Sequence, residues 1–560
     1  MRPLTIRRLV AACLAVATPV ILVSCASFSS LGPRPVLAVV NARIWTGVEA
    51  RPWAEALAVD SAGRITAIGS SRMVGQLGAG TVIDAKGQMV VPGFVDTHVH
   101  FIEGGFGLAS VRLRDARTKE EFIRRIRDHA RTLPKGAWVT NGDWDHQNWG
   151  GELPRRDWID SVTPDNPVWI NRLDGHMNLA NTLTLQAARL TRGTADVAGG
   201  EIVRDAAGEL TGIFKDNAQD LVAGAMRTPP VAVEDRALDT AMAHVASYGV
   251  TSVHSMGSWH DLTIFRRAHG TARQRTRIYA MTPLAEWTRL RDTVAVRGRG
   301  DDWLRIGGLK GFVDGSLGSH TAAMFEDFTD KPGDRGLFVT APESLYARVS
   351  GADRAGLQVM VHAIGDRAIA TQLDIFARVA RENGARDRRF RIEHAQHIAA
   401  RDFGRFRSLG VIPSMQPYHA IDDGRWADRV IGTDRSSRTY AFKSLLDAGA
   451  AVAFGSDWFV APPRPLEAIY AAVTRRTLDD RTPAGWYPAQ KITVEQALRA
   501  HTRGGAFAGF DEANRGTLQL GMLADFALLE RDITRIPPEQ IRDVRVMRTV
   551  VGGRTVFERK

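Results

Sequence analysis

Short segments in which apolar and polar residues alternate lie at both ends of the chain. They predict strands over 36–45, 57–60, 65–68 and 81–91, and again over 526–529, 544–551 and 555–557. Ala62 and Gly63 provide the turn of an N-terminal hairpin. Because the same pattern appears at opposite ends, we expect one small sheet domain made of residues 36–91 and 511–560, with a larger domain between them.

The middle of the chain repeats a different unit, in which a short apolar run is followed by a helical pattern. The apolar runs cover 137–140, 168–170, 251–253, 277–280, 307–313, 358–361, 389–392, 411–414 and 450–454. Segment 118–133 shows the helical pattern, with a Thr118–Glu121 capping box and one apolar face made of Phe122, Ile126, Ala130 and Leu133. Repeated units of this kind predict an α/β fold, a (β/α)8 TIM-like barrel over residues 92–510.

Histidines and one carboxylate follow the predicted barrel strands. His98 and His100 are two residues apart on a strand, so both point to the same face and can hold a divalent metal. His362, His394 and Asp457 each end another apolar run. Because a barrel gathers the C-terminal ends of its strands around one point, these five residues predict a metal site.

Lys310 lies within the apolar run 306–313, where an ammonium is costly and its pKa is pushed toward neutrality. Two interpretations remain open from the residues alone. The lysine pairs with a nearby acid, for which Asp314 is the obvious candidate. Alternatively, the neutral amine reacts with carbon dioxide, and the resulting carbamate supplies two oxygens that bridge two metal ions.

The formal charge of +11 changes this picture little. Arginines such as Arg124 and Arg125 are interspersed with carboxylates rather than concentrated in a stripe, so we expect no nucleic-acid partner. The two cysteines are Cys13 and Cys25, and the sequence after residue 25 has none. Disulfides within that part, cysteine-ligated zinc and cysteine nucleophiles are therefore excluded.

The first 25 residues are typical of an exported lipoprotein. Arginines precede the apolar run 9–23, which is too short for a membrane span but suits a signal peptide. The sequence LVSC at 22–25 resembles the bacterial lipobox, although an ordinary cleaved secretory signal is the alternative. We expect a signal peptide over 1–25, lipid attachment at Cys25 and a tether over 26–35. The protein would then lie in the bacterial cell envelope, facing the periplasm and anchored to the membrane by lipid.

Five sequence blocks, in one order, carry a resemblance to a known family. They are PGFVDTHVH, LKGFVDGSLGSHTA, VHAIGD, IEHAQ and FGSDW, and shorter blocks such as SMQP and GMLAD accompany them. The chain resembles the amidohydrolase superfamily, in particular its family 3 branch, which includes N-substituted formamide deformylase. The likeness runs from about residue 36 to about residue 556.

The resemblance implies a barrel with a small β-sandwich and a centre of one or two divalent metal ions, with zinc as the expected metal. By motif position, the implied metal ligands are His98, His100, Lys310, His362, His394 and Asp457. It favours the carbamate form of Lys310, and it implies that Asp457 also shuttles a proton. His176 would contact the substrate or an oxyanion. His320 stands where relatives often have arginine, which puts substrate choice in doubt.

These residues predict hydrolysis of a carbon–nitrogen bond, other than a peptide bond, in a small amide, N-formyl or N-acyl substrate. A metal-activated hydroxide would attack the carbonyl carbon, with Asp457 as proton shuttle. Two alternatives stay open: a hydrolase of a cyclic amide, urea-like or ester bond, and a non-catalytic binding lipoprotein of the envelope.

Substrate contacts are harder to predict from sequence. Trp144 and Trp458, with Trp149 and Trp486, either line an apolar pocket together with His320 or pack loops onto the barrel. Arg475 and Arg476 either hold a substrate carboxylate or are surface charges on a helix.

Overall fold

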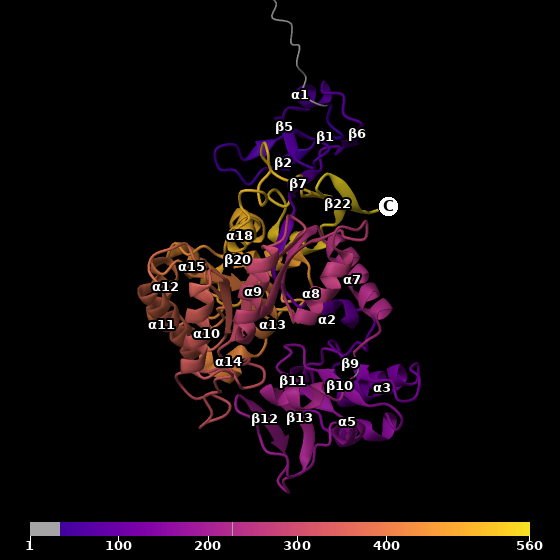
Figure 1. Ribbon diagram of the computed structural model, residues 1–560, viewed down its shortest axis with the longest axis vertical. Coiled ribbons are helices and arrows are strands. Elements are labelled where there is room, and N and C mark those ends of the chain that lie inside the picture. The colour runs from indigo at the N-terminus through magenta and orange to yellow at the C-terminus, as the bar shows by residue number, and fades with distance from the viewer. Residues whose placement is uncertain (1–33, 227) are drawn as a thin grey trace, which may run out of the picture.

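The computed structural model describes residues 34–226 and 228–560, so the expected signal peptide and lipid site at Cys25 lie outside the described residues. Three parts follow one another along the longest axis of the molecule (Figure 1). Sheets from the two chain ends lie at the top, a barrel lies in the centre, and an additional sheet lies at the bottom. Of the helices in the described ranges, none is both long and apolar enough to cross a bilayer.

Eight parallel strands form the central barrel. In order around it they are β8 (Phe94–Val99), β14 (Val250–Met256), β15 (Arg277–Pro283), β16 (Leu304–Phe312), β17 (Gln358–Ala363), β18 (Arg391–His394), β19 (Ile412–Met415) and β20 (Ala453–Phe454). The sheet closes beyond β20, where the His100 amide donates to the Trp458 carbonyl at 2.6 Å and the Asp457 amide donates to the His98 carbonyl at 2.7 Å. The predicted barrel is confirmed.

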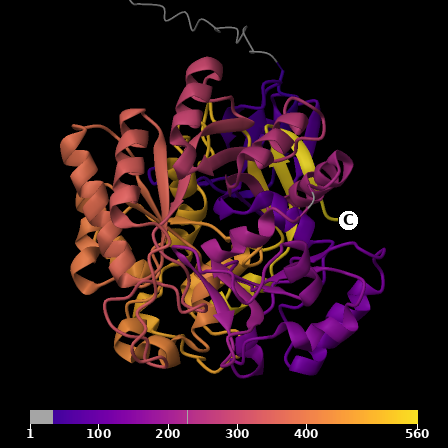
Figure 2. The same ribbon diagram turned by 60° about the horizontal axis from the view of Figure 1, so that its bottom comes forward.

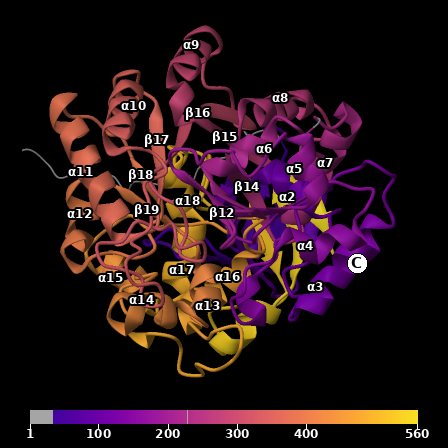
Figure 3. The same ribbon diagram turned by 90° about the horizontal axis from the view of Figure 1, so that it is seen from below.

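Helices surround the barrel because each presents one apolar face to the strands (Figure 3). In α11 (Asp366–Glu382), buried Ile369, Leu373 and Phe376 recur at helical spacing. The other helices include α2 (Phe101–Gly107), α7 (Val231–Ala246), α8 (Trp259–Ala268), α9 (Trp287–Arg297), α10 (Pro342–Arg354), α12 (Phe403–Ser408), α13 (Pro417–Asp423), α14 (Ala427–Ser436), α15 (Phe442–Asp447), α16 (Pro465–Thr474), α17 (Val494–His501) and α18 (Arg503–Ala508).

The two chain ends together form a β-sandwich beside the barrel. One sheet contains β5 (Ile65–Gly69), β4 (Ala56–Val59), β1 (Leu37–Val40) and β6 (Thr81–Asp84), with α1 (Ser71–Gly75) packed against it. The other contains β23 (Arg554–Glu558), β22 (Val546–Val551), β21 (Phe526–Leu529), β7 (Met89–Pro92), β2 (Arg43–Trp45) and β3 (Trp53–Ala54). Leu57 and Ile83 share one core with Phe526 and Val550, so residues from both ends stabilise the same domain.

A buried ion pair joins the barrel to this sandwich. Arg277, on β15, donates from Nε to Asp525 Oδ2 at 2.7 Å and from Nη2 to Asp525 Oδ1 at 2.9 Å. The Gly552 amide donates to the same Oδ1 at 2.7 Å. Arg277 is 2% exposed and Asp525 is 4% exposed, so neither charge has water to replace its partner.

One sheet was not foreseen from the sequence. It contains β12 (Gly200–Arg204), β13 (Leu210–Asp216), β11 (Met177–Ala180), β10 (Val168–Asn171) and β9 (Val139–Thr140), and α3 (Lys119–Ala130), α4 (Arg156–Ile159) and α5 (Thr182–Ala187) pack with it. The prediction that 137–140 and 168–170 are barrel strands is therefore wrong. β9 and β10 are parallel and joined through a helix, so their local pattern equals that of a barrel unit.

This insertion lies at the end of the barrel opposite the sandwich (Figures 1 and 2). α3 forms where the sequence predicts a helix, and the Thr118 hydroxyl accepts from the Glu121 amide at its start. Its buried Phe122 and Ile126 belong to the core of the insertion, together with Trp144 and Ile170. The insertion therefore has a core of its own and contributes loops to the nearby barrel mouth.

Candidate metal centre

The C-terminal ends of the barrel strands bring His98, His100 and Asp457 together. Asp457 Oδ1 lies 3.4 Å from His98 Nε2 and 3.5 Å from His100 Nε2, and the three ligand atoms fall within 4.8 Å of one another. Ligands of a tetrahedral ion with bonds of about 2.0–2.1 Å stand about 3.4 Å apart, so this spacing fits a zinc-sized cation. Asp457 Oδ1 is buried with no hydrogen-bond partner among the described residues, so it is free to act as a ligand of a cation.

The protonation states of the buried groups suit metal binding. Burial lowers the pKa of His98, His362 and His394 well below the usual range, so their imidazoles are neutral and able to ligate. Burial by itself would raise the pKa of Asp457, but the nearby imidazoles of His98 and His100 lower it to about 2. Asp457 is therefore a carboxylate.

Neighbouring polar side chains set which imidazole nitrogen is free to bind metal. His98 Nδ1 lies 2.6 Å from Glu393 Oε2, and His394 Nδ1 lies 2.9 Å from Gln416 Oε1. Arg391 in turn donates to Glu393 Oε1 at 2.7 Å. These contacts occupy the Nδ1 atoms and leave Nε2 of both histidines for a cation.

A second group of ligand atoms shares Asp457. It consists of His394, His419 and Asp457, whose ligand atoms lie within 4.8 Å of one another. His362 lies beside this group, since its ring centroid is 4.5 Å from that of His394. His362 Nε2 lies 2.9 Å from the Gly315 carbonyl oxygen. A carboxylate between two ligand groups has the arrangement that a two-ion centre requires.

Lys310, on β16, lies next to His98 of this cluster. Its Nζ lies 3.2 Å from His98 Nε2, and the residue is 6% exposed. Burial lowers the pKa of Lys310 to about 8, which increases the share of reactive neutral amine. Asp314 instead accepts from the amides of Ala323, Ile364 and Gly365 at 2.8–3.0 Å, so the geometry does not support it as the partner of Lys310.

His176 reaches the same place from the insertion. Its ring centroid is 4.8 Å from that of His362, and its Nδ1 lies 2.6 Å from Asp216 Oδ1 at the end of β13. Burial alone would lower the pKa of His176, but the bond to Asp216 raises it above its usual value. The insertion thus supplies an imidazole, already oriented by a carboxylate, to the barrel mouth.

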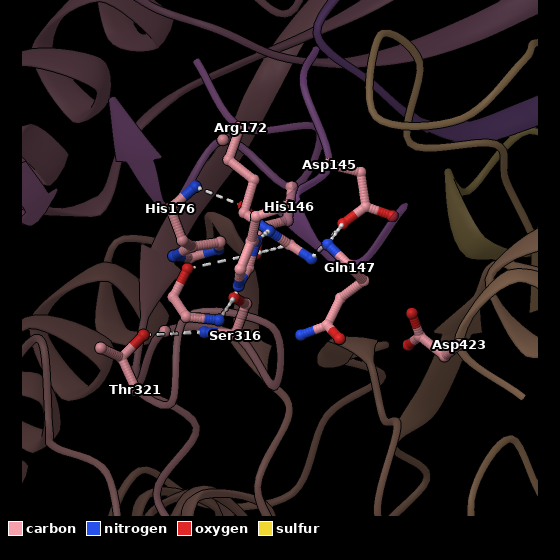
Figure 4. A network of polar contacts seen from close by, with 12 residues as sticks. Asp145, His146, Gln147, Arg172, His176, Ser316, Thr321 and Asp423 are labelled. Carbon is pink, nitrogen blue, oxygen red and sulfur yellow. Dashed lines mark hydrogen bonds and ion pairs between the residues drawn. The ribbon is translucent and has the colours of Figure 1, made fainter. Parts of the chain in front are cut away.

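A pocket opens over these residues. Among the side chains that line it are His176, His362, His394, His419 and Asp457. The insertion forms part of the wall through a polar network around Arg172 (Figure 4). In that network Arg172 Nη1 donates to Asp174 Oδ2 at 2.6 Å, and the Ser316 hydroxyl donates to the same oxygen.

Three predicted substrate contacts lie elsewhere. Trp144 is fully buried in the core of the insertion, with its Nε1 donating to the Ile170 carbonyl at 3.0 Å. Trp458 stacks on His244 and packs against Gly104, on the helix side of the barrel wall. His320 pairs with Asp330 at 3.0 Å. These three are absent from the residues that line the pocket, so the structure does not support direct substrate contact.

Arg475 is not a substrate-binding residue either. It is fully buried and donates to the carbonyl oxygens of Trp486, Tyr440 and Thr439 at 2.6, 2.9 and 3.3 Å. Its donors are used to hold loops together, and Trp486 is part of the same packing.

Sequence reasoning missed four residues of the site: Glu393, Gln416, His419 and Asp216. Glu393 and Gln416 lie inside conspicuous blocks, IEHAQ and SMQP, and His419 follows three residues after Gln416. Those blocks could have indicated that Glu393, Gln416 and His419 belong to the site. Nothing local distinguishes Asp216, because its partner His176 is 40 residues away in sequence.

Comparison with known proteins agrees with this geometry. A profile of the amidohydrolase family matches residues 81–557. The chain is 39% identical over 538 residues to Protein LONG AFTER FAR-RED 3 of Arabidopsis thaliana, covering 93% of this chain and 91% of that protein. It is 27% identical over 544 residues to N-substituted formamide deformylase of Arthrobacter pascens, covering 93% and 98% respectively.

A solved structure shows the same fold. The crystal structure of an uncharacterized metal-dependent hydrolase from Pyrococcus horikoshii superposes with a TM-score of 0.73 at 27% identity. The match covers 90% of this chain and 99% of that chain. The family profile spans most of the sequence, and the metal-ligand geometry stands at the expected end of the barrel. The chain belongs to the amidohydrolase family.

Proposed function

We propose that this metal-dependent amidohydrolase cleaves a carbon–nitrogen bond other than a peptide bond, in a small amide, N-formyl or N-acyl compound. The observation that carries the proposal is Asp457. Its buried Oδ1 has no hydrogen-bond partner among the described residues and lies close to His98 and His100, and Asp457 lines a pocket that also contains His176. The similarity to an N-substituted formamide deformylase supports the N-formyl class.

Different residues of the site would bind the cation, transfer the proton and stabilise the oxyanion. His98, His100, His394 and Asp457 would hold the cation, for which zinc is the proposed identity, as one or two ions. A divalent cation bound there lowers the pKa of a coordinated water to about 7 and polarises a carbonyl oxygen. Asp457 would orient the attacking water, accept its proton and pass the proton to the leaving nitrogen. His176, oriented by Asp216, stabilises the developing oxyanion.

The test is metal analysis of the purified protein followed by a screen of matched substrates. N-formyl, N-acyl, cyclic amide, urea and ester compounds should share the same carbon skeleton. Turnover is expected on the acyclic amides, and removal of metal by a chelator is expected to abolish it. Turnover confined to the cyclic or ester compounds would select the other hydrolase class, and binding without turnover would select a non-catalytic role.

We also propose that Lys310 carries a carbamate formed with carbon dioxide. Lys310→Ala is expected to lose at least one equivalent of bound metal, because the buried amine is the precursor of a bridging ligand. Elemental analysis measures this, and bicarbonate with a short carboxylic acid should restore part of the metal. Lys443→Ala is the control, since Lys443 is half-exposed and pairs with Asp447. Unchanged metal content in Lys310→Ala would rule out the carbamate.

The N-terminal residues support a proposal about location. We propose that the mature protein is a lipoprotein of the cell envelope, anchored through Cys25 and facing the periplasm. In cell fractionation, the native chain is expected in the membrane fraction and Cys25→Ser in the soluble fraction, because a serine cannot be lipidated. A Cys25→Ser protein that stays with the membrane contradicts lipid anchoring.

A further inference from the structure

α13 carries polar side chains from the metal centre toward the outer pocket. His419, Asp422 and Asp423 occupy positions i, i+3 and i+4, so they share one face of the helix. All three line the pocket described above. Because a helix rises about 1.5 Å per residue, Asp423 stands about 6 Å beyond His419 along the helix axis. A substrate held at the metal centre would extend toward Asp423.

The two carboxylate oxygens of Asp423 differ in their hydrogen bonding. Its Oδ2 accepts from Tyr440 Oη at 2.5 Å and from Gln396 Nε2 at 3.0 Å. Among the described residues no hydrogen-bond donor reaches its Oδ1. Asp423 stands apart from the Arg172 network in Figure 4. The free oxygen of Asp423 can therefore accept a hydrogen bond from a group in the pocket that the residue lines.

The one basic side chain found in the pocket lining is already paired with carboxylates. Arg172 is the one lysine or arginine among the described residues that line it. Its Nη1 donates to Asp174 at 2.6 Å, its Nη2 to Asp145 at 3.2 Å and its Nε to His146 at 3.3 Å. Three of its five N–H donors are used in these contacts, and the guanidinium faces two carboxylates with which an anionic substrate would have to compete.

The surroundings of Asp423 also fit a cation. Trp426 lines the same pocket three residues further along the chain, and a pocket lined by an indole and a carboxylate suits an ammonium group. Burial, together with the charge of Asp422, raises the pKa of Asp423 to about 7, although the hydrogen bond from Tyr440 and the charges of Arg172 and Arg425 lower it. A cation placed at Oδ1 would compensate the charge that burial penalises.

We propose that Asp423, with Trp426, binds a positively charged amino group of the substrate. The inference rests on the proposed function and narrows it: preferred substrates are amides that carry an ammonium group several bonds away from the scissile carbon–nitrogen bond. Mono-N-acylated and mono-N-formylated diamines are the simplest members of that class. Amides with a carboxylate at the same position are disfavoured.

The first experiment compares three formamides of matched length on the metal-loaded protein. The probes are N-formyl-1,5-diaminopentane, N-formylpentylamine and 5-formamidopentanoate. We expect kcat/KM to be about 10- to 100-fold higher for the ammonium probe than for the neutral one, which is the range of a charge-assisted hydrogen bond. The carboxylate probe is expected to be the poorest. Equal values for the three probes contradict the inference.

Asp423→Asn is the sharpest variant for this test. An asparagine oxygen can still accept from Tyr440 and Gln396, which leaves its NH2 group pointing into the pocket as a donor. The ratio of kcat/KM for the ammonium probe to that for the carboxylate probe should therefore fall by about 100-fold. Asp434→Asn on α14 is the control, because Asp434 is 85% exposed and pairs with Arg438. Its ratio should equal that of the native protein.

The two possible failures can be told apart. If none of the three formamides is hydrolysed and the wider amide screen is also negative, the proposed function fails. If the neutral probe is hydrolysed while the ammonium probe shows no preference, only the role of Asp423 fails. The comparison of probes on the native protein needs no variant, so a folding defect in Asp423→Asn would not obscure it. An unaltered probe ratio in a folded Asp423→Asn would also overturn the inference.

Discussion

Asp457→Asn is expected to lower kcat by about 10³-fold, within the 10²- to 10⁴-fold range typical of a lost general base. The asparagine has nearly the same shape and keeps one oxygen as a ligand, but it cannot accept a proton from water. Steady-state kinetics on an N-formyl substrate would measure this loss. Metal content should be determined on the same sample, because Asp457 also belongs to both groups of ligand atoms.

A control variant and the metal content of Asp457→Asn are needed to interpret that experiment. Asp447→Asn, at an exposed carboxylate paired with Lys443, should keep the native rate. If Asp457→Asn retains both its metal and its full rate, Asp457 is not the proton shuttle. If the metal is lost along with activity, the ligand role dominates, and adding metal in excess should reveal the remaining defect in proton transfer.

Asp525→Ala is expected to lower the free energy of unfolding by about 3–5 kcal/mol. The change removes the partner of Arg277, which is 2% exposed and donates two hydrogen bonds to that carboxylate. The Gly552 amide loses its acceptor as well. Denaturant unfolding followed by circular dichroism would measure the change.

Glu530→Ala is the matched control for this prediction. Glu530 pairs with Arg545 at 2.5 Å, but that arginine is 59% exposed, and a solvated pair contributes about 0–1 kcal/mol. A loss below about 1 kcal/mol in Asp525→Ala would mean that water enters the interface and replaces the carboxylate. The barrel–sandwich contact would then depend on apolar packing alone.

The barrel and part of its metal centre were predictable because both depend on local patterns. Strand–helix repeats identify parallel units, and residues that end such strands must meet at one end of a barrel. His98, His100, His394 and Asp457 were found in this way, and the structure brings them together. The hairpin of β4 and β5 was likewise visible from its alternation and its Ala62-Gly63 turn.

The insertion was not predictable from the same signals. β9 and β10 are short, parallel and joined through a helix, so their pattern matches a barrel unit even though they pair in another sheet. Tryptophans posed a similar problem. An indole that lines a pocket and one that fills a core look alike in sequence, and Trp144 and Trp458 proved to be core residues.

The sequence by itself determined the family, the barrel and a set of histidines with one aspartate at the strand ends. Only the tertiary structure decided which groups orient that set and which face the substrate. Glu393 holds His98, Asp216 holds His176, and Tyr440 and Gln396 hold Asp423. The physical reason is distance along the chain. A strand places residues two apart on one face, whereas these partnerships join side chains 295 and 40 residues apart, and only folding brings such groups within hydrogen-bond reach.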